Sequence, residues 1–117
     1  MKVKIGIMPT KEFQQYMLDV AAGRIKVKRG SPKIWFNSMK SLAEVLSDNN
    51  RQLLKIIADE KPETIQALAD ITGRRASNLS RTLKTFESYG FVEMVANARS
   101  KKPVAKATEF DICIPVA

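Results

Sequence analysis

Two short segments with helical apolar periodicity meet at Gly73, and this junction constrains the fold more than any other feature of the chain. Residues 64–72 place three apolar side chains on one helix face, Ile65, Leu68 and Ala69. Gly73 stands where a left-handed residue would end that helix. A second helical pattern begins at about residue 75 or 76 and runs to Tyr89. The sequence therefore predicts two helices joined by a tight turn.

The second helix, residues 76–89, has two faces of different chemistry. At about 100° per residue, Leu79, Leu83 and Phe86 fall on one side, and we expect them in the core. The opposite and flanking positions carry short hydrogen-bonding side chains and two cations, Ser77, Asn78, Ser80, Arg81 and Lys84. Such a surface suits base edges and phosphates. The alternative role for the two serines and the asparagine is to cap the helix.

A β-hairpin with a basic tip is predicted after these helices. Residues 91–95 are strand-like, residues 96–102 form a small, polar and basic turn region, and residues 103–115 alternate again. The bases of the tip, Arg99, Lys101 and Lys102, are expected to follow a minor groove or a phosphate strand. Arg74 and Arg75, just before the second helix, are expected to contact phosphate beside its N-terminus.

The remaining pattern predicts an α+β fold with an N-terminal strand and helix extension. A strand at residues 2–7 precedes a helix from Thr10 to Ala22, and a basic connector leads to an extended segment at residues 33–36. Helices at 38–47 and 49–60 follow, the latter capped by Ser47 or Asp48. We therefore divide the chain into residues 1–47, with the helix at 10–22 as candidate dimer element, and a helix and hairpin domain at 48–117.

The charge of the chain favours a polyanionic partner. The 117 residues carry 20 Lys and Arg against 12 Asp and Glu, which leaves a formal charge of +8. Residues 72–102 alone hold seven bases against two acids. A solvated face is the alternative reading of such a charge excess, and the helical pattern favours nucleic acid over it.

The composition also argues against several functional classes. Histidine is absent and Cys113 is the sole cysteine, which leaves no zinc constellation and no disulfide. No Gly-rich phosphate loop or nucleophile motif is present, so we expect neither an enzyme nor a cofactor. No apolar run reaches the length of a signal-peptide core or a membrane span, and we expect a cytoplasmic protein.

The segment from Ile65 to Gly73, continued by residues 77–84 and 89–93, resembles the winged helix-turn-helix of the MarR and ArsR type transcriptional regulators. It resembles most closely a group of small archaeal and bacterial predicted DNA-binding regulators. The motifs that recur in such families fall here on Leu68 and Ala69, on residues 80–83, and on residues 90–92. The resemblance implies a winged helix-turn-helix with helix 76–89 in the major groove and the hairpin tip 96–102 as the wing.

Two functions follow as hypotheses. The first is a sequence-specific double-stranded DNA-binding transcriptional regulator that acts as a homodimer on a two-fold operator. The second is an antitoxin-like autoregulator that binds a toxin-like partner protein through its N-terminal part, which the basic connector and the small size of the chain allow. DNA binding by the pure protein alone would favour the first hypothesis.

Overall fold

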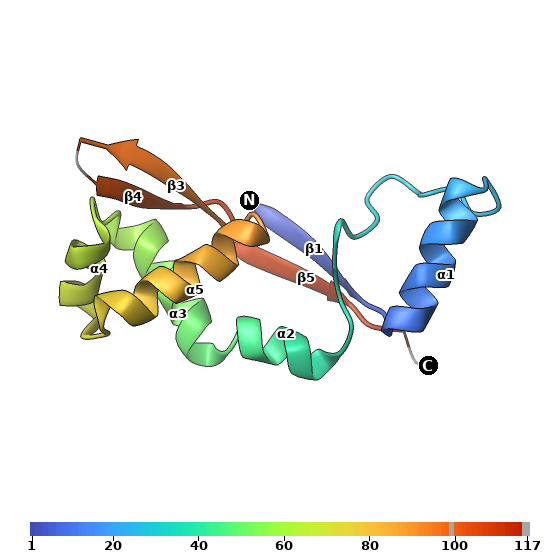
Figure 1. Ribbon diagram of the computed structural model, residues 1–117, viewed down its shortest axis with the longest axis horizontal. Helices are drawn as coiled ribbons and strands as arrows, with labels where there is room; N and C mark the ends of the chain where they lie inside the picture. Colours follow the sequence, from blue (N-terminus) through green and yellow to red (C-terminus); the bar gives the residue numbers. More distant parts are fainter. Residues whose placement is uncertain (99, 116–117) are drawn as a thin grey trace. The chain divides into compact units, whose positions relative to one another are not determined.

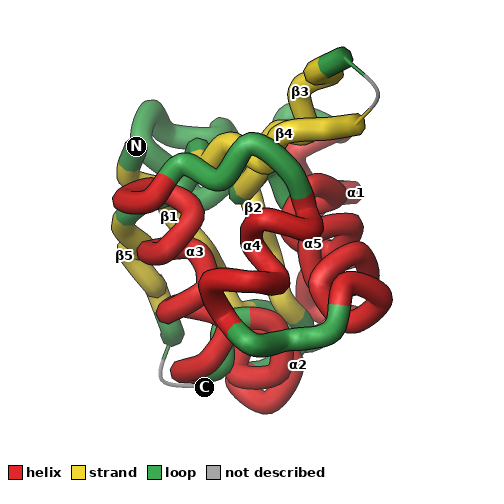
Figure 2. The backbone as a smooth tube through the Cα atoms, turned by 90° about the vertical axis from the view of Figure 1, so that its left-hand side faces the viewer, coloured by secondary structure: helices red, strands yellow, loops and turns green. Residues whose placement is uncertain are grey.

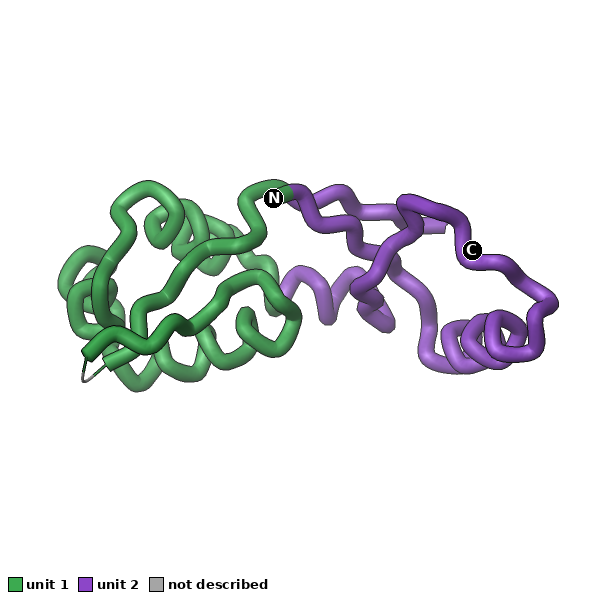
Figure 3. Tube along the Cα trace, turned by 90° about the horizontal axis from the view of Figure 1, so that it is seen from above, with its two compact units in different colours: residues 1, 45–109 green, residues 2–44, 110–117 purple. Residues whose placement is uncertain are grey.

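The computed structural model describes residues 1–98 and 100–115. The chain forms two compact units (Figure 3). Unit 1 contains Met1 and the continuous segment Val45–Glu109, and unit 2 contains Lys2–Glu44 together with the chain from Phe110 onward. Helices and strands occur in both units, so the prediction of an α+β class is confirmed.

The elements follow the chain in the order shown in Figure 1. They are β1 (Lys2–Ile7), α1 (Thr10–Ala21), β2 (Ile34–Phe36), α2 (Met39–Val45), α3 (Asp48–Glu60), α4 (Ile65–Thr72), α5 (Ala76–Ser88), β3 (Val92–Asn97), β4 (Ser100–Ala105) and β5 (Glu109–Cys113). Each of the five helices lies where the periodicity predicted one. No helix within residues 1–98 and 100–115 is long and apolar enough to cross a membrane.

Unit 2 is built around a three-stranded sheet in the order β2-β1-β5. Strands β1 and β2 are parallel, with Gly6 opposite Trp35. The Trp35 indole lies directly against Gly6, where even a Cβ atom would collide with the ring. The rings of Phe13 and Tyr16 on α1 lie 5.9 and 5.8 Å from the same indole. Two aromatic side chains of α1 thus pack against one tryptophan of the sheet, and none of the residues of α1 is fully buried.

Unit 1 packs α3, α4 and α5 together with the β3–β4 hairpin. Its most deeply buried side chains come from all of these helices, from the residue before β3 and from β4, namely Leu53, Ile57, Leu68, Leu79, Leu83, Phe86, Phe91 and Pro103. Local capping fixes where the helices begin, because Ser47 accepts from the amide of Asn50 and Thr64 accepts from the amide of Ala67. The helical core of unit 1 thus follows from short-range signals.

The hairpin turn is tighter than the sequence predicted. Strands β3 and β4 are antiparallel and remain paired from Val92 opposite Ala105 to Asn97 opposite Ser100 (Figure 2). Only residues 98 and 99 connect them, so the prediction of a turn at 96–102 is wrong. Lys101 and Lys102 belong to β4. A two-stranded ribbon has a solvated face, so charged side chains do not interrupt it.

The alternating pattern at residues 103–115 is two strands and not one arm of a hairpin. Strand β4 ends at Ala105, where the amides of Lys106 and Ala107 both donate to the carbonyl of Phe91, over 2.9 and 3.0 Å. Ala107 is buried at this bend, and β5 then lies beside β1. The alternation hid the break because residues 106–108, which lie outside both strands, continue the sequence pattern with a period of two.

Candidate nucleic-acid interface

The turn between α4 and α5 sets the position of the candidate interface. Gly73 ends α4 with φ of 73°, a left-handed conformation that glycine adopts without strain. Arg75 occupies the position before the first turn of α5, and no side chain caps that turn. The alternative role of Ser77, Asn78 and Ser80 as N-caps is therefore wrong, because the helix begins at Ala76. The unpaired amide groups of its first turn form the positively polarised end of the helix.

Helix α5 has one buried and one exposed face, as its periodicity predicted. Leu79, Leu83 and Phe86 are at most 1% exposed, which confirms their place in the core. The predicted contact residues on the other face are all exposed, namely Ser77, Asn78, Ser80, Arg81 and Lys84. Within the described parts of the chain, the side chains of Arg81 and Lys84 have no hydrogen bond or ion pair. Both cations are thus available to a ligand.

Arg74 differs from these exposed bases because its side chain is bound within unit 1. Its Nε donates to Oδ1 of Asn78 over 3.1 Å, and its Nη2 donates to Oδ1 of Asn50 over 3.4 Å. The side-chain amide of Asn50 in turn donates to the carbonyl of Val45 over 3.0 Å. Arg74 therefore ties the first turn of α5 to α3.

A shallow groove of about 650 Å³ lies beside this arginine, between α3, the α4–α5 turn and the start of α5. The groove holds two arginines and no acidic residue. Its lining consists of Asn49, Gln52, Leu53, Ile56, Ile71, Thr72, Arg74, Arg75 and Asn78. Arg75 is exposed here and donates to no other described residue through its side chain. Both arginines lie in the α4–α5 turn, and α3 contributes only uncharged residues to the groove.

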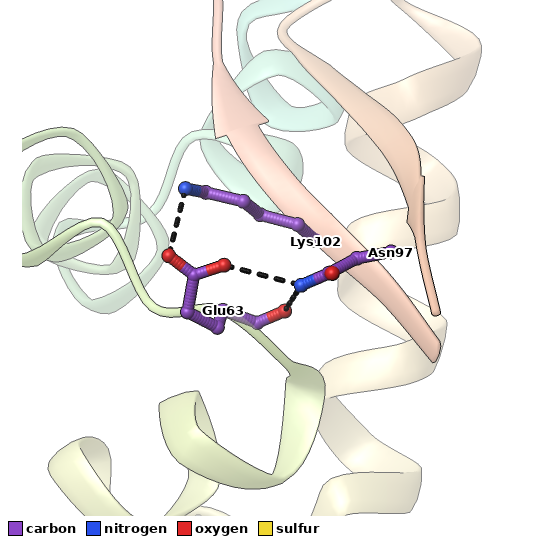
Figure 4. Close-up of polar contacts among 3 residues, drawn as sticks. All are labelled: Glu63, Asn97 and Lys102. Atoms are coloured by element: carbon purple, nitrogen blue, oxygen red, sulfur yellow. Dashed lines mark hydrogen bonds and ion pairs between the residues drawn. The ribbon is translucent and has the colours of Figure 1, made fainter. Parts of the chain in front are cut away.

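The cations of the hairpin are not equivalent (Figure 4). Nζ of Lys102 lies 3.1 Å from Oε1 of Glu63, which precedes α4. The Asn97 amide donates to Oε2 of the same carboxylate over 3.1 Å and to the Glu63 carbonyl over 3.3 Å. Lys101 is exposed and has no such partner among the residues described. Arg99 lies outside the described residues.

Sequence reasoning missed the two residues that organise this surface, Asn50 and Glu63. Asn50 is separated from Arg74 by 24 residues, and Glu63 from Lys102 by 39. The sequence places Asn50 near the start of a predicted helix and Glu63 just before another. No local pattern identifies the residues that they contact. The residues in the structure also include no group of three or more His, Cys, Asp or Glu that could hold a metal ion.

Comparison with protein families shows which family the chain matches. The family model HVO_A0114 matches residues 45–112, which is more than half of the chain. The match includes the whole continuous segment of unit 1. No curated protein and no solved structure matches the chain.

Proposed function

The chain belongs to the HVO_A0114 family, and we propose that it is a sequence-specific double-stranded DNA-binding transcriptional regulator of the winged helix-turn-helix type. The observation that carries this proposal is the division of α5 into a fully buried face and an exposed face with two cations and no acid before Glu87, which lies near the C-terminal end of the helix. A helix whose opposite face is buried in the core presents side chains that reach base edges and phosphates. In the proposed complex α5 enters the major groove.

The surroundings of α5 supply contacts to the DNA backbone in this proposal. Arg75 and the uncapped first turn of α5 favour a phosphate, because backbone amides and a cation converge at one helix end. Lys101 on β4 reaches a second stretch of backbone from the wing. Base edges are read by Ser77, Asn78, Ser80 and Arg81, and Lys84 adds a phosphate contact.

The proposed regulator acts as a homodimer through unit 2. Helix α1 leaves Met17 and Leu18 exposed by 46% and 61%, although it packs on the sheet through Phe13 and Tyr16. A single winged module buries too little surface for high specificity, whereas two copies read half-sites about one helical turn apart. A toxin-like protein is the competing partner for this surface, and DNA binding by the pure protein argues against a requirement for it.

The test is the salt dependence and sequence selectivity of DNA binding by the purified full chain. Selection from a random duplex pool should yield a two-fold symmetric site. For about 6 to 10 phosphate contacts, the affinity should fall by about 10³ to 10⁵ between about 50 and about 200 mM salt. Arg81→Ala should weaken binding to the selected site by about 5-fold to 100-fold. Unchanged binding by Arg81→Ala would contradict the placement of α5 in the DNA interface.

A further inference from the structure

The hydrogen bonds around Arg74 fix the orientation of one side chain on the exposed face of α5. A guanidinium has five N–H donors and no acceptor, so it can bond only the oxygen of an amide. Because Nε of Arg74 lies 3.1 Å from Oδ1 of Asn78, the oxygen of that amide faces the α4–α5 turn. The NH₂ group of Asn78 therefore points away from Arg74 and has no partner among the described residues.

Arg74 is itself held in place, so this orientation does not depend on one flexible contact. Nη2 of the same guanidinium donates to Asn50, and the Asn50 amide is oriented by its own bond to the Val45 carbonyl. The backbone amide of Arg74 donates to Oγ1 of Thr72 over 3.2 Å, which fixes the start of the turn. Arg74 is half-buried, whereas its neighbour Arg75 is exposed.

We propose that Asn78 presents a hydrogen-bond donor to DNA and selects guanine over adenine at one base pair, with Arg74 as the positioning residue that sets this preference. This inference rests on the proposed function. An unconstrained asparagine pairs with adenine, accepting from N6 through its oxygen and donating to N7 through its nitrogen. Here the bond from Arg74 turns the oxygen toward the α4–α5 turn and away from the exposed side, and the exposed NH₂ matches the two acceptors of guanine, N7 and O6.

The proposal changes the role expected of Arg74. A phosphate-binding arginine lowers affinity for all sequences when it is removed, and the salt slope becomes shallower by about 0.9 for each contact. A positioning arginine instead alters which base is preferred. Its removal frees the Asn78 amide to rotate, so the adenine pairing becomes available.

Sequence selection with four proteins tests this inference, namely the wild type, Arg74→Ala, Asn78→Ala and Arg75→Ala as the matched control. The base pair that loses its preference in Asn78→Ala identifies the position read by Asn78. At this position the wild type should favour guanine over adenine by about 5-fold to 10-fold, the value of about one net hydrogen bond. Arg74→Ala should abolish or reverse that preference. Arg75→Ala should keep it and flatten the salt slope.

A measurement on the free protein keeps the test independent of DNA. In ¹H–¹⁵N spectra the Nε–H of Arg74 should exchange with water at least about 5-fold more slowly than that of Arg75, and Asn78→Ala should remove this protection. Far-ultraviolet circular dichroism checks that each variant is folded. If the wild type prefers guanine and a folded Arg74→Ala keeps that preference, the inference is wrong but the proposed function stands. A protected Nε–H in a protein that binds no DNA overturns the proposed function, and the inference with it.

Discussion

Lys102 donates from Nζ to Oε1 of Glu63 over 3.1 Å, while Oε2 of the same carboxylate accepts from Asn97 on the opposite strand (Figure 4). One carboxylate thus holds both strands of the hairpin to the segment before α4. It also neutralises a lysine that lies on the proposed DNA-binding side. Glu63 is 66% exposed, so a phosphate can compete with it for the ammonium group.

Glu63→Gln should strengthen DNA binding. The substitution keeps a hydrogen-bonding side chain at the hairpin but releases the ammonium of Lys102 for a phosphate. We expect the slope of log affinity against log salt to become steeper by about 0.9 per protomer, measured by fluorescence anisotropy. The free energy of unfolding should fall by about 0.2 to 1 kcal/mol, because the lost ion pair is partly exposed.

The control for this change is Glu60→Gln, which removes the same charge at the end of α3. Glu60 is exposed and pairs with no other residue in the described structure. Its loss should raise affinity only through the net charge of the protein. Equal salt slopes for the two variants would contradict the role given to Glu63.

Lys101→Ala should weaken DNA binding more than Lys102→Ala. Lys101 is exposed on β4 and its charge is not neutralised by any described acid, whereas Lys102 is paired with Glu63. Loss of Lys101 should flatten the salt slope by about 0.9 per protomer, and loss of Lys102 by less. Titrations at several salt concentrations compare the two. An equal effect of the two would mean that DNA displaces Glu63 from Lys102, and a larger effect of Lys102 would contradict the prediction.

Leu79→Ala should destabilise unit 1 strongly. Leu79 is fully buried on the inner face of α5, so its truncation leaves a cavity that costs about 2 to 5 kcal/mol. Urea unfolding followed by circular dichroism should show a lower midpoint with an unchanged m value. The neighbouring Ser80→Ala is the control, and as an exposed change it should stay within about 0.5 kcal/mol of the wild type. Similar midpoints for both variants would mean that α5 is not braced through Leu79.

Leu18→Glu should dissociate the proposed homodimer. Leu18 is 61% exposed on α1, and a charge at a buried apolar contact is costly. Sedimentation velocity at tens of micromolar should show a dimer for the wild type and a monomer for the variant. Gln52→Glu adds the same charge at an exposed position of α3, outside the proposed dimer element, and should remain dimeric. A monomeric wild type would contradict the dimer itself.

The helices could be predicted because their signals are local. Ser47 and Thr64 bond amides only three residues ahead, and Gly73 ends α4 through its own backbone conformation. The buried face of α5 follows in the same way from the spacing of three apolar residues. The sequence therefore sufficed for the segments that carry the proposed recognition surface.

The contacts between distant segments could not be predicted. The pairing of β5 with β1 joins residues about 100 positions apart. The alternation of residues 103–115 does not indicate which strand pairs with them. The ion pair of Lys102 and the bonds of Arg74 have the same character, because a base in a sequence shows its charge but not the acid or amide that meets it. The sequence therefore does not distinguish a cation that is free to bind a ligand from one that is paired within the folded chain.

The placement of β5 beside β1 has a consequence for how the protein is made. A ribosome synthesises β1 first and β5 only after residues 45–108, nearly the whole continuous segment of unit 1, have been synthesised. Throughout that interval β1 lacks one of its two neighbours, and an unpaired strand edge readily pairs with another chain. The nascent protein is thus most prone to aggregate while its helices are already able to fold.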